Sequence, residues 1–201
     1  MLGVRILIID FYDSFVYNLA DYFRSEGCDV EVVQDDQVPQ DLSFFMPKFN
    51  GVVLSPGPGL PEETHSMMRV IRYCESSIPI LGVCLGMQGI GIHLGGTLVN
   101  LSTVRHGVSI DLKVLKDSSL FKGLTVPIKV GLYHSWAVED LPLDYLTACD
   151  EKGVAMAMDA EDKLLTGVQF HPESVMTSSG KRMIFNWVSS CKNRLSVLPE
   201  Q

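Results

Sequence analysis

The sequence Ile78-Pro79-Ile80-Leu81-Gly82-Val83-Cys84-Leu85-Gly86 joins a short aliphatic run to a second apolar segment through the pattern G-x-C-x-G. The aliphatic run is typical of a strand buried on both faces, and the pattern predicts a tight turn from that strand into a helix. A cysteine at such a turn stands above the edge of the sheet, at the positive end of the helix, which favours its thiolate. Cys84 is therefore a candidate nucleophile, although the same residues also fit a buried cysteine between two packing glycines.

Aliphatic runs alternate with amphipathic stretches throughout the first half of the chain. The spacing predicts strands at Val4–Ile9, Asp29–Gln34, Gly51–Leu54 and Ile78–Val83. It predicts helices from Ser14, as the N-terminal cap, to Gly27, over Thr64–Glu75 and over Leu85–Leu94. Repeated strand–helix–strand units of this kind indicate a parallel sheet with helices on both faces.

The pattern changes after Thr97, where the apolar runs become short or alternate with polar residues. We expect these runs to form antiparallel strands that extend one end of the sheet. They are Val108–Leu115, Ile128–Tyr133, Leu146–Ala148, Val154–Met158 and Leu164–Phe170, and a helix over Ser179–Lys192 follows. The sequence thus predicts an α/β fold, an open and mostly parallel sheet of flavodoxin-like type flanked by helices, with antiparallel strands from the second half. No linker or repeat interrupts it, so we expect residues 1–201 to form a single domain.

The charge balance and the cysteines disfavour several classes of protein. The chain has 24 acidic residues against 16 lysines and arginines, and this net charge of −8 disfavours binding to nucleic acid or to an anionic membrane. No apolar run approaches the roughly 18 residues of a membrane span, and the N-terminus does not resemble a signal peptide, so we expect a cytoplasmic protein. The five cysteines form no C-x-x-C pair and the five histidines are dispersed, so neither a disulfide framework nor a metal site is expected.

A second segment holds residues that could take part in catalysis. It is Gly167-Val168-Gln169-Phe170-His171-Pro172-Glu173, in which a histidine ends an apolar strand. A carboxylate two residues later can orient the imidazole and stabilise its protonated form. Ligands of parallel sheets collect at the carboxyl ends of the strands, where Cys84 and His171 are both expected. The loop Ser55-Pro56-Gly57-Pro58-Gly59 follows another strand and can present a backbone N–H to an oxyanion.

Together these three motifs resemble those of the class I (triad) glutamine amidotransferases, in which they occur in the same order. Further segments resemble one branch of that family, the amidotransferase subunits of anthranilate synthase and of 4-amino-4-deoxychorismate synthase. These segments are Asp10-Phe11-Tyr12-Asp13-Ser14-Phe15 with Tyr17-Asn18-Leu19, then Tyr133-His134-Ser135, then Thr177, Gly180-Lys181 and Asn186-Trp187. The resemblance spans nearly the whole chain and implies the fold of that family.

The resemblance implies a role for each residue that matches a catalytic motif. Cys84 would attack the side-chain amide of L-glutamine, His171 would carry the thiol proton to the leaving ammonia, and Glu173 would orient His171. Backbone N–H groups of Gly57 and Leu85 would form the oxyanion hole. A glutamyl thioester on the cysteine would then hydrolyse to glutamate.

The same resemblance implies four further contacts with the substrate. Gln88 lies one helical turn beyond the nucleophile, where side chains four residues apart share a face. Ser135 and Trp136 would supply backbone contacts to the α-carboxylate of glutamine, and Gly59 would line the same pocket as Gly57.

The resemblance also implies a partner, a chorismate-binding synthase subunit that receives ammonia within a hetero-oligomer and makes anthranilate for tryptophan biosynthesis. Magnesium is expected on that subunit and no cofactor on this chain. Two alternatives stay open, the same role in 4-aminobenzoate and folate synthesis, and a non-catalytic regulatory subunit with the same fold. Amidotransferases that serve a nucleotide or carbamoyl-phosphate pathway fit the Tyr133-His134-Ser135 segment less well, and peptidase-like cysteine hydrolases lack the Gln88 feature.

Four positions depart from the pattern of this branch. Met87 stands where histidine is common, and we expect it to alter packing behind Cys84 without removing the chemistry. Val108, Leu132 and Trp136 stand where lysine, arginine and leucine are usual. We expect these three residues to lie on the surface that meets the synthase subunit and to affect coupling to it.

Overall fold

A computed structural model describes residues 3–197 of the chain. The strands are β1 (Arg5–Asp10), β2 (Asp29–Gln34), β3 (Gly51–Leu54), β4 (Ile80–Val83), β5 (Thr97–Asp111), β6 (Lys113–Val114), β7 (Lys129–Glu139), β8 (Leu146–Cys149), β9 (Ala155–Ala160) and β10 (Leu165–Val168). The helices are α1 (Val16–Ser25), α2 (Met67–Cys74), α3 (Leu85–His93) and α4 (Gly180–Val197), with short 3-10 turns between some of these elements.

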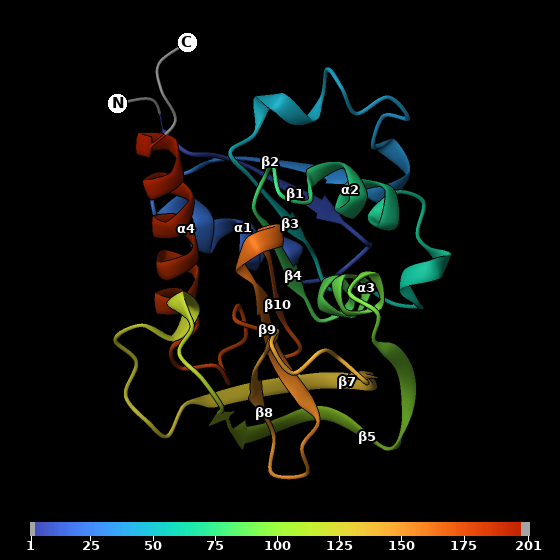
Figure 1. Ribbon diagram of the computed structural model, residues 1–201, viewed down its shortest axis with the longest axis vertical. Helices are drawn as coiled ribbons and strands as arrows, with labels where there is room; N and C mark the ends of the chain where they lie inside the picture. Colours follow the sequence, from blue (N-terminus) through green and yellow to red (C-terminus); the bar gives the residue numbers. More distant parts are fainter. Residues whose placement is uncertain (1–2, 198–201) are drawn as a thin grey trace.

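Eight of these strands form one sheet in the order β2-β1-β3-β4-β10-β9-β8-β6 (Figure 1). The pairs from β2 to β10 are parallel, and the pairs from β10 to β6 are antiparallel. This is the predicted α/β fold, with a parallel half built by the first part of the chain and an antiparallel extension built by the second. Because β4 and β10 are neighbours and run parallel, their carboxyl ends meet at one edge of the sheet.

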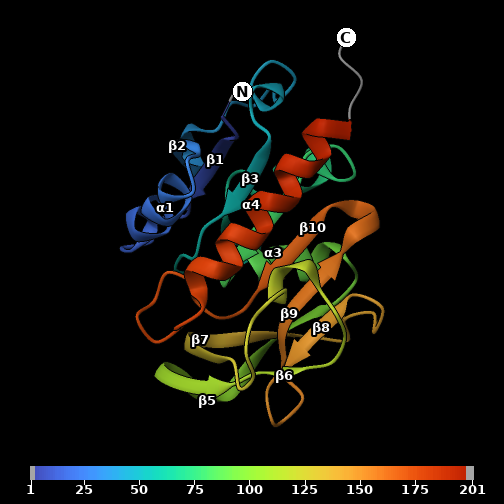
Figure 2. The ribbon, with the colours of Figure 1, turned by 90° about the vertical axis from the view of Figure 1, so that its left-hand side faces the viewer.

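Side chains of the central strands alternate between two separate hydrophobic cores. In β1, Ile6 and Ile8 pack in the core beneath α1 and α4, whereas Leu7 and Ile9 pack in the core beneath α2 and α3. Figure 2 shows α1 and α4 together on one side of the sheet. The rings of Phe23 and Trp187 meet edge to face there, with centroids 5.8 Å apart. Burial on both faces explains why these strands are continuous aliphatic runs and do not alternate with polar residues.

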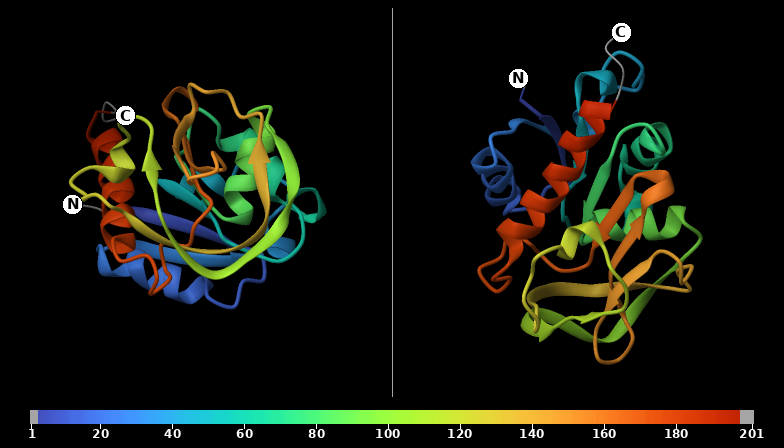
Figure 3. Two further views of the ribbon diagram at one scale, coloured as in Figure 1. Left: turned by 90° about the horizontal axis from the view of Figure 1, so that it is seen from below. Right: turned by 60° about the vertical axis from the view of Figure 1, so that its left-hand side comes forward.

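The second half of the chain differs from the prediction in its pairing. Strands β5 and β7 form a separate two-stranded antiparallel ribbon, which curves beneath the sheet in Figure 3. The expectation that Val108–Leu115 and Ile128–Tyr133 extend the main sheet is therefore wrong, apart from the short strand β6. Leu165–Val168 pairs parallel with β4, so it belongs to the parallel half as well as to the antiparallel extension.

Two helices begin later in the chain than the sequence predicted. Helix α1 begins at Val16 with Phe15 as its N-cap residue and no side-chain cap, so the prediction of Ser14 as the cap is wrong. The carboxylate of Asp13 accepts the Phe15 N–H instead, at 2.9 Å. Helix α2 begins at Met67, not at Thr64, because a 3-10 turn precedes it. Among the described residues, no helix combines the length and the apolar composition needed to cross a membrane.

Candidate active site

Cys84 occupies a strained turn between β4 and α3. Its φ of 51° and ψ of −101° lie outside the regions that L-residues favour, and it is the N-cap residue of α3. Its N–H donates to the Val168 carbonyl at 2.8 Å, so the cysteine extends the ladder between β4 and β10 by one residue. This is the geometry of a nucleophile elbow, in which backbone strain is held by the surrounding sheet and places the side chain at a helix N-terminus.

Two glycines leave the space that this turn requires. A Cβ at Gly86 would lie 2.6 Å from the Leu54 Cβ and would also collide with the Leu54 carbonyl. A Cβ at Gly57 would lie 2.7 Å from the Phe11 Cβ. The backbone of α3 and the loop after β3 therefore approach their neighbours more closely than any larger residue permits. That close approach brings the Gly57 loop to the same end of the sheet as Cys84.

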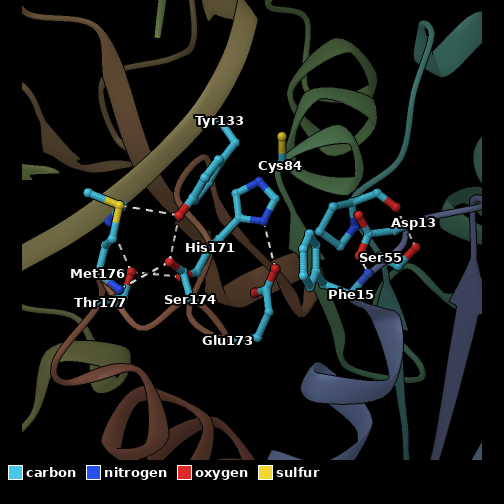
Figure 4. A network of polar contacts seen from close by, with 12 residues as sticks. Asp13, Phe15, Ser55, Cys84, Tyr133, His171, Glu173, Ser174, Met176 and Thr177 are labelled. Atoms are coloured by element: carbon cyan, nitrogen blue, oxygen red, sulfur yellow. Dashed lines mark hydrogen bonds and ion pairs between the residues drawn. The ribbon is translucent and has the colours of Figure 1, made fainter. Parts of the chain in front are cut away.

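His171 and Glu173 lie beside Cys84 at the end of β10. The His171 Nδ1 and the Glu173 Oε1 are 2.6 Å apart, and both side chains are buried. Figure 4 shows the imidazole between Cys84 and the Glu173 carboxylate, with the second ring nitrogen, Nε2, toward Cys84. That nitrogen is buried and has no hydrogen-bond partner among the described residues, so it is free to exchange a proton. A cysteine, a histidine and a carboxylate thus converge as the sequence predicted.

The loop that carries His171 is held by its own hydrogen bonds. The Thr177 hydroxyl donates to the His171 carbonyl at 2.6 Å and accepts the Gly131 N–H at 3.0 Å. The Tyr133 ring packs edge to face on the imidazole, with centroids 5.0 Å apart, and its hydroxyl meets the Ser174 hydroxyl at 3.0 Å. Figure 4 shows Tyr133, Ser174 and Thr177 around His171. The hydrogen bonds hold the backbone of His171, the Tyr133 ring packs on the imidazole itself, and none of these contacts uses Nε2.

The surroundings of His171 favour its protonated form. Burial by itself lowers the pKa of this imidazole, but the adjacent side chains of Cys84 and Glu173 outweigh burial and raise the pKa to about 10, from the ordinary 6.5. The site therefore stabilises an imidazolium next to the sulfur. An imidazolium at this position can act as the general acid toward a leaving group.

We expect this shift to appear in the pH dependence of stability. A group whose pKa is raised by folding adds stability that is fully present below its unfolded pKa and is lost as the pH rises through the folded value. The stability difference between the wild type and Glu173→Gln should therefore be largest at about pH 6 and shrink toward about pH 10. Urea denaturation at several pH values measures it. A difference that grew with pH would contradict the assignment.

A cavity of about 320 Å³ lies on one side of Cys84. All the residues predicted to form the oxyanion hole or to contact the substrate line it, and the structure thus brings them together with Cys84. They are Gly57, Gly59, Leu85, Gln88, Ser135 and Trp136, and Pro58, Leu60, Tyr133 and His134 complete the wall. Gln88 lies one turn along α3 and donates from Nε2 to the Trp136 carbonyl at 3.0 Å. Strand β7 therefore forms one wall of this cavity, although it is separate from the main sheet.

A second cavity of about 480 Å³ also borders Cys84 and shares Gly57 and Tyr133 with the first. His171 and Glu173 line it, together with Asp13 and Phe15 from the segment before α1. Burial is the main cause that raises the pKa of Asp13, and the negative charge of Glu173 acts in the same direction. Asp13 was not predicted as a site residue, because nothing within its own segment shows that it lies near the triad.

Over residues 7–191 the sequence matches the family described as glutamine amidotransferase class-I. The chain belongs to this family. Anthranilate synthase component 2 of Mycobacterium tuberculosis is 38% identical to it over 200 residues, which make up 94% of this chain and 83% of that protein. Aminodeoxychorismate synthase of Streptomyces griseus is 40% identical over 187 residues, 92% of this chain and 26% of that protein.

The bifunctional protein TrpGD of Thermotoga maritima is 38% identical over 191 residues, 92% of this chain, and the chain spans only 32% of its length. A solved structure from Thermoplasma acidophilum, of a protein assigned to GMP synthase as one of its subunits, superposes with a TM-score of 0.85, over 98% of each chain at 24% identity. The fold of this class-I amidotransferase is thus shared with a solved structure of distant sequence.

Four residues of this amidotransferase depart from the pattern of the branch that its sequence resembles, and the structure shows where each of them lies. Met87 is fully buried and packs against Gly167 in β10, which places it behind Cys84. Val108 is exposed on β5, as expected of a surface residue. Leu132 is fully buried in the core beneath α1 and α4, so the expectation that it lies on a docking surface is wrong. Trp136 lines the 320 Å³ cavity beside Cys84.

Proposed function

We propose that this chain hydrolyses L-glutamine to glutamate and ammonia through Cys84, His171 and Glu173. The observation that supports the proposal best is the position of Cys84, which lines two cavities at once and faces the His171–Glu173 pair in the second. Glutamine would occupy the 320 Å³ cavity, with its side-chain amide at the sulfur. Its carbonyl oxygen would accept from the N–H groups of Gly57 and Leu85 as negative charge develops on it.

The arrangement of the site determines which group gives and which group takes each proton in the reaction. The Cys84 thiolate attacks the amide carbon, and the His171 imidazolium gives its proton to the departing nitrogen, which leaves as neutral ammonia. A water molecule, deprotonated by the now neutral imidazole, then attacks the thioester carbon. The carbon–sulfur bond breaks, glutamate leaves with its carboxyl proton passing to solvent, and the thiolate–imidazolium pair is restored. Glu173 holds Nδ1 throughout, so Nε2 stays directed at the reacting atoms.

The second cavity offers ammonia a route away from the glutamine pocket. Its walls include Phe15, Tyr133 and Val175, and Val175 is 96% exposed at the rim. Ammonia that reached bulk water at neutral pH would become ammonium and lose its nucleophilic lone pair. A chorismate-binding synthase subunit covering this opening would keep the passage dry and receive the ammonia.

We infer that this synthase subunit makes anthranilate, as in the tryptophan pathway, and that any magnesium binds to the synthase. The relative of Mycobacterium tuberculosis named as an anthranilate synthase component supports this inference. The alternative acceptor chemistry, toward 4-aminobenzoate, is supported by the relative named as an aminodeoxychorismate synthase. A regulatory subunit without turnover is the weaker alternative, because all three predicted catalytic residues are present and lie together.

The direct test combines the purified chain with the chorismate-binding synthase subunit of the same organism. With glutamine and chorismate, we expect equal amounts of glutamate and of an aromatic amine, which chromatography identifies as anthranilate or 4-aminobenzoate. Without the synthase, we expect glutamate release to fall at least about tenfold, because the partner completes or orders the pocket. Absence of glutamate from the complete mixture would refute the glutaminase proposal, and full activity of the lone chain would refute the need for a partner.

A further inference from the structure

A line of buried side-chain amides connects the wall of the glutamine pocket to the sulfur of Cys84. The Gln88 Nε2 donates to the Trp136 carbonyl at 3.0 Å and to the Gln169 Oε1 at 3.3 Å. The Gln169 Nε2 in turn lies 3.5 Å from the Cys84 Sγ, within the range of a hydrogen bond to sulfur. Gln169 is completely buried and Gln88 is only 3% exposed. No role for Gln169 follows from the triad or from the oxyanion hole.

The direction of each amide in this line is determined by the backbone carbonyl at its end. A carbonyl oxygen can only accept, so the Gln88 nitrogen must face Trp136. The second hydrogen of that nitrogen then needs an acceptor, which places the Gln169 oxygen toward Gln88. The Gln169 nitrogen is left facing the sulfur, and Gln169 therefore offers Cys84 an N–H donor.

A histidine fills the remaining lone pair of the same carbonyl. The His134 Nδ1 lies 2.8 Å from the Trp136 oxygen and must be the donor there. Burial is the main cause that lowers the pKa of His134, which suits a neutral ring with its proton on Nδ1. With two donors on one oxygen, the Trp136 carbonyl cannot accept from elsewhere, and the amide line has a single orientation.

The sheet register explains why Gln169 reaches the sulfur. Strands β4 and β10 run parallel with Val83 level with Val168, so the next residues, Cys84 and Gln169, lie side by side. Gln169 precedes His171 by two residues, and both come just after Val168, the last residue of β10. One strand end thus supplies two groups to the nucleophile, the imidazole and the amide.

We propose that Gln169 is a further catalytic residue, whose amide N–H donates to the Cys84 sulfur and stabilises the thiolate before attack. A hydrogen bond to a charged acceptor is stronger than one to a neutral acceptor, so the amide favours the thiolate over the thiol. The bond weakens when the sulfur becomes part of a neutral thioester, so it supports the reactive form without favouring the intermediate. Gln88 holds the Gln169 amide in place through its nitrogen, and its own side-chain oxygen stays available to the substrate. Gln88 and Gln169 thus connect the glutamine pocket to the Cys84 sulfur.

The test follows alkylation of Cys84 by iodoacetamide as a function of pH, on the full chain, with the Cys84 peptide quantified by mass spectrometry. In Gln169→Met, which keeps the length of the side chain but lacks the donor, we expect the midpoint of the pH profile to rise by about one unit, a tenfold smaller thiolate population at lower pH. Gln169→Glu is the second variant, and its carboxylate facing the sulfur should raise the midpoint at least as far.

The control is Thr166→Val. Thr166 lies in β10, the strand that leads to Gln169, and the substitution removes a hydrogen bond to Asp159 that does not involve the sulfur. Its midpoint should match that of the wild type, and thermal unfolding of every variant shows which of them are folded. An unchanged midpoint in either folded Gln169 variant overturns the proposal, because a purely structural role would change thermal stability and not the midpoint.

The consequence for turnover rests on the proposed glutaminase function, whereas the alkylation profile does not. With the synthase present, kcat for glutamate release should fall about tenfold in Gln169→Met while KM changes less than about twofold. Failure of the wild type to release glutamate would refute the glutaminase function and leave the alkylation result interpretable. A rise in KM at unchanged kcat would show that Gln169 acts on substrate binding, and would overturn its assignment to the sulfur.

Discussion

Cys84→Ser is expected to abolish glutamine-dependent formation of the aromatic amine, with a loss of at least about a thousandfold. The serine hydroxyl is a far weaker acid than a thiol, so the His171 imidazolium beside it no longer has a thiolate as its partner. The strained backbone of the elbow and the buried position of the side chain are compatible with serine, so the fold should persist. The synthase should therefore still aminate chorismate when ammonia is supplied directly.

The comparison of the two nitrogen sources makes this experiment specific. Cys28→Ser is the matched control, because Cys28 is also a buried free thiol but packs beneath α1, away from both cavities. It should retain glutamine-dependent activity within about twofold of the wild type. If Cys84→Ser released glutamate at the native rate, another residue would be the nucleophile. If it lost the ammonia-dependent reaction as well, the substitution would have damaged assembly with the synthase.

His171→Ala should be nearly as damaging as loss of the nucleophile, about a thousandfold in kcat, and Glu173→Ala clearly milder, by about ten- to a hundredfold. The ranking follows from the geometry of the pair. His171 carries the only ring nitrogen directed at Cys84 in the described site, whereas Glu173 contacts the opposite nitrogen at 2.6 Å and never meets the reacting atoms. Without Glu173, the Tyr133 ring still packs on the imidazole, and the Thr177 hydroxyl still holds the backbone carbonyl of His171.

Steady-state glutamate release with the synthase measures both variants, with His65→Ala as the matched control on an exposed histidine. A kcat for Glu173→Ala below that for His171→Ala would reverse the two roles. Added imidazole offers an independent check, since it can enter the space left in His171→Ala from the second cavity and should restore part of the activity. The same compound should have no effect on Glu173→Ala, which keeps its own ring.

Much of the geometry of the candidate site could be predicted from the sequence because it depends on neighbours within one segment. The turn at Cys84 follows from an aliphatic strand, two glycines and the helix after them, all within a few residues. The His171–Glu173 contact joins residues only two apart. Their meeting at one edge of the sheet follows from a general rule of parallel sheets, and the register of β4 with β10 confirms it.

Other features depend on contacts between distant segments, and local patterns do not report those. The ribbon β5–β7 alternates like an edge strand of the main sheet, yet within residues 3–197 β5 pairs only with β7. Leu132 was expected on a surface because of the residue type it replaces, but its side chain on β7 points into the core. Asp13 reaches the second cavity only through the placement of the segment before α1.

Local covalent order and the spacing of apolar residues thus determine the α/β class of this protein, the elbow at Cys84 and the pair formed by His171 and Glu173. Those features arise from backbone sterics and from burial periods of a few residues. Only the tertiary structure decides that the Gln169 amide, 85 positions along the chain, faces the Cys84 sulfur, and that Cys84 borders two cavities. The physical reason is that strand register and side-chain packing between distant segments depend on the whole core, whose shape no single segment encodes.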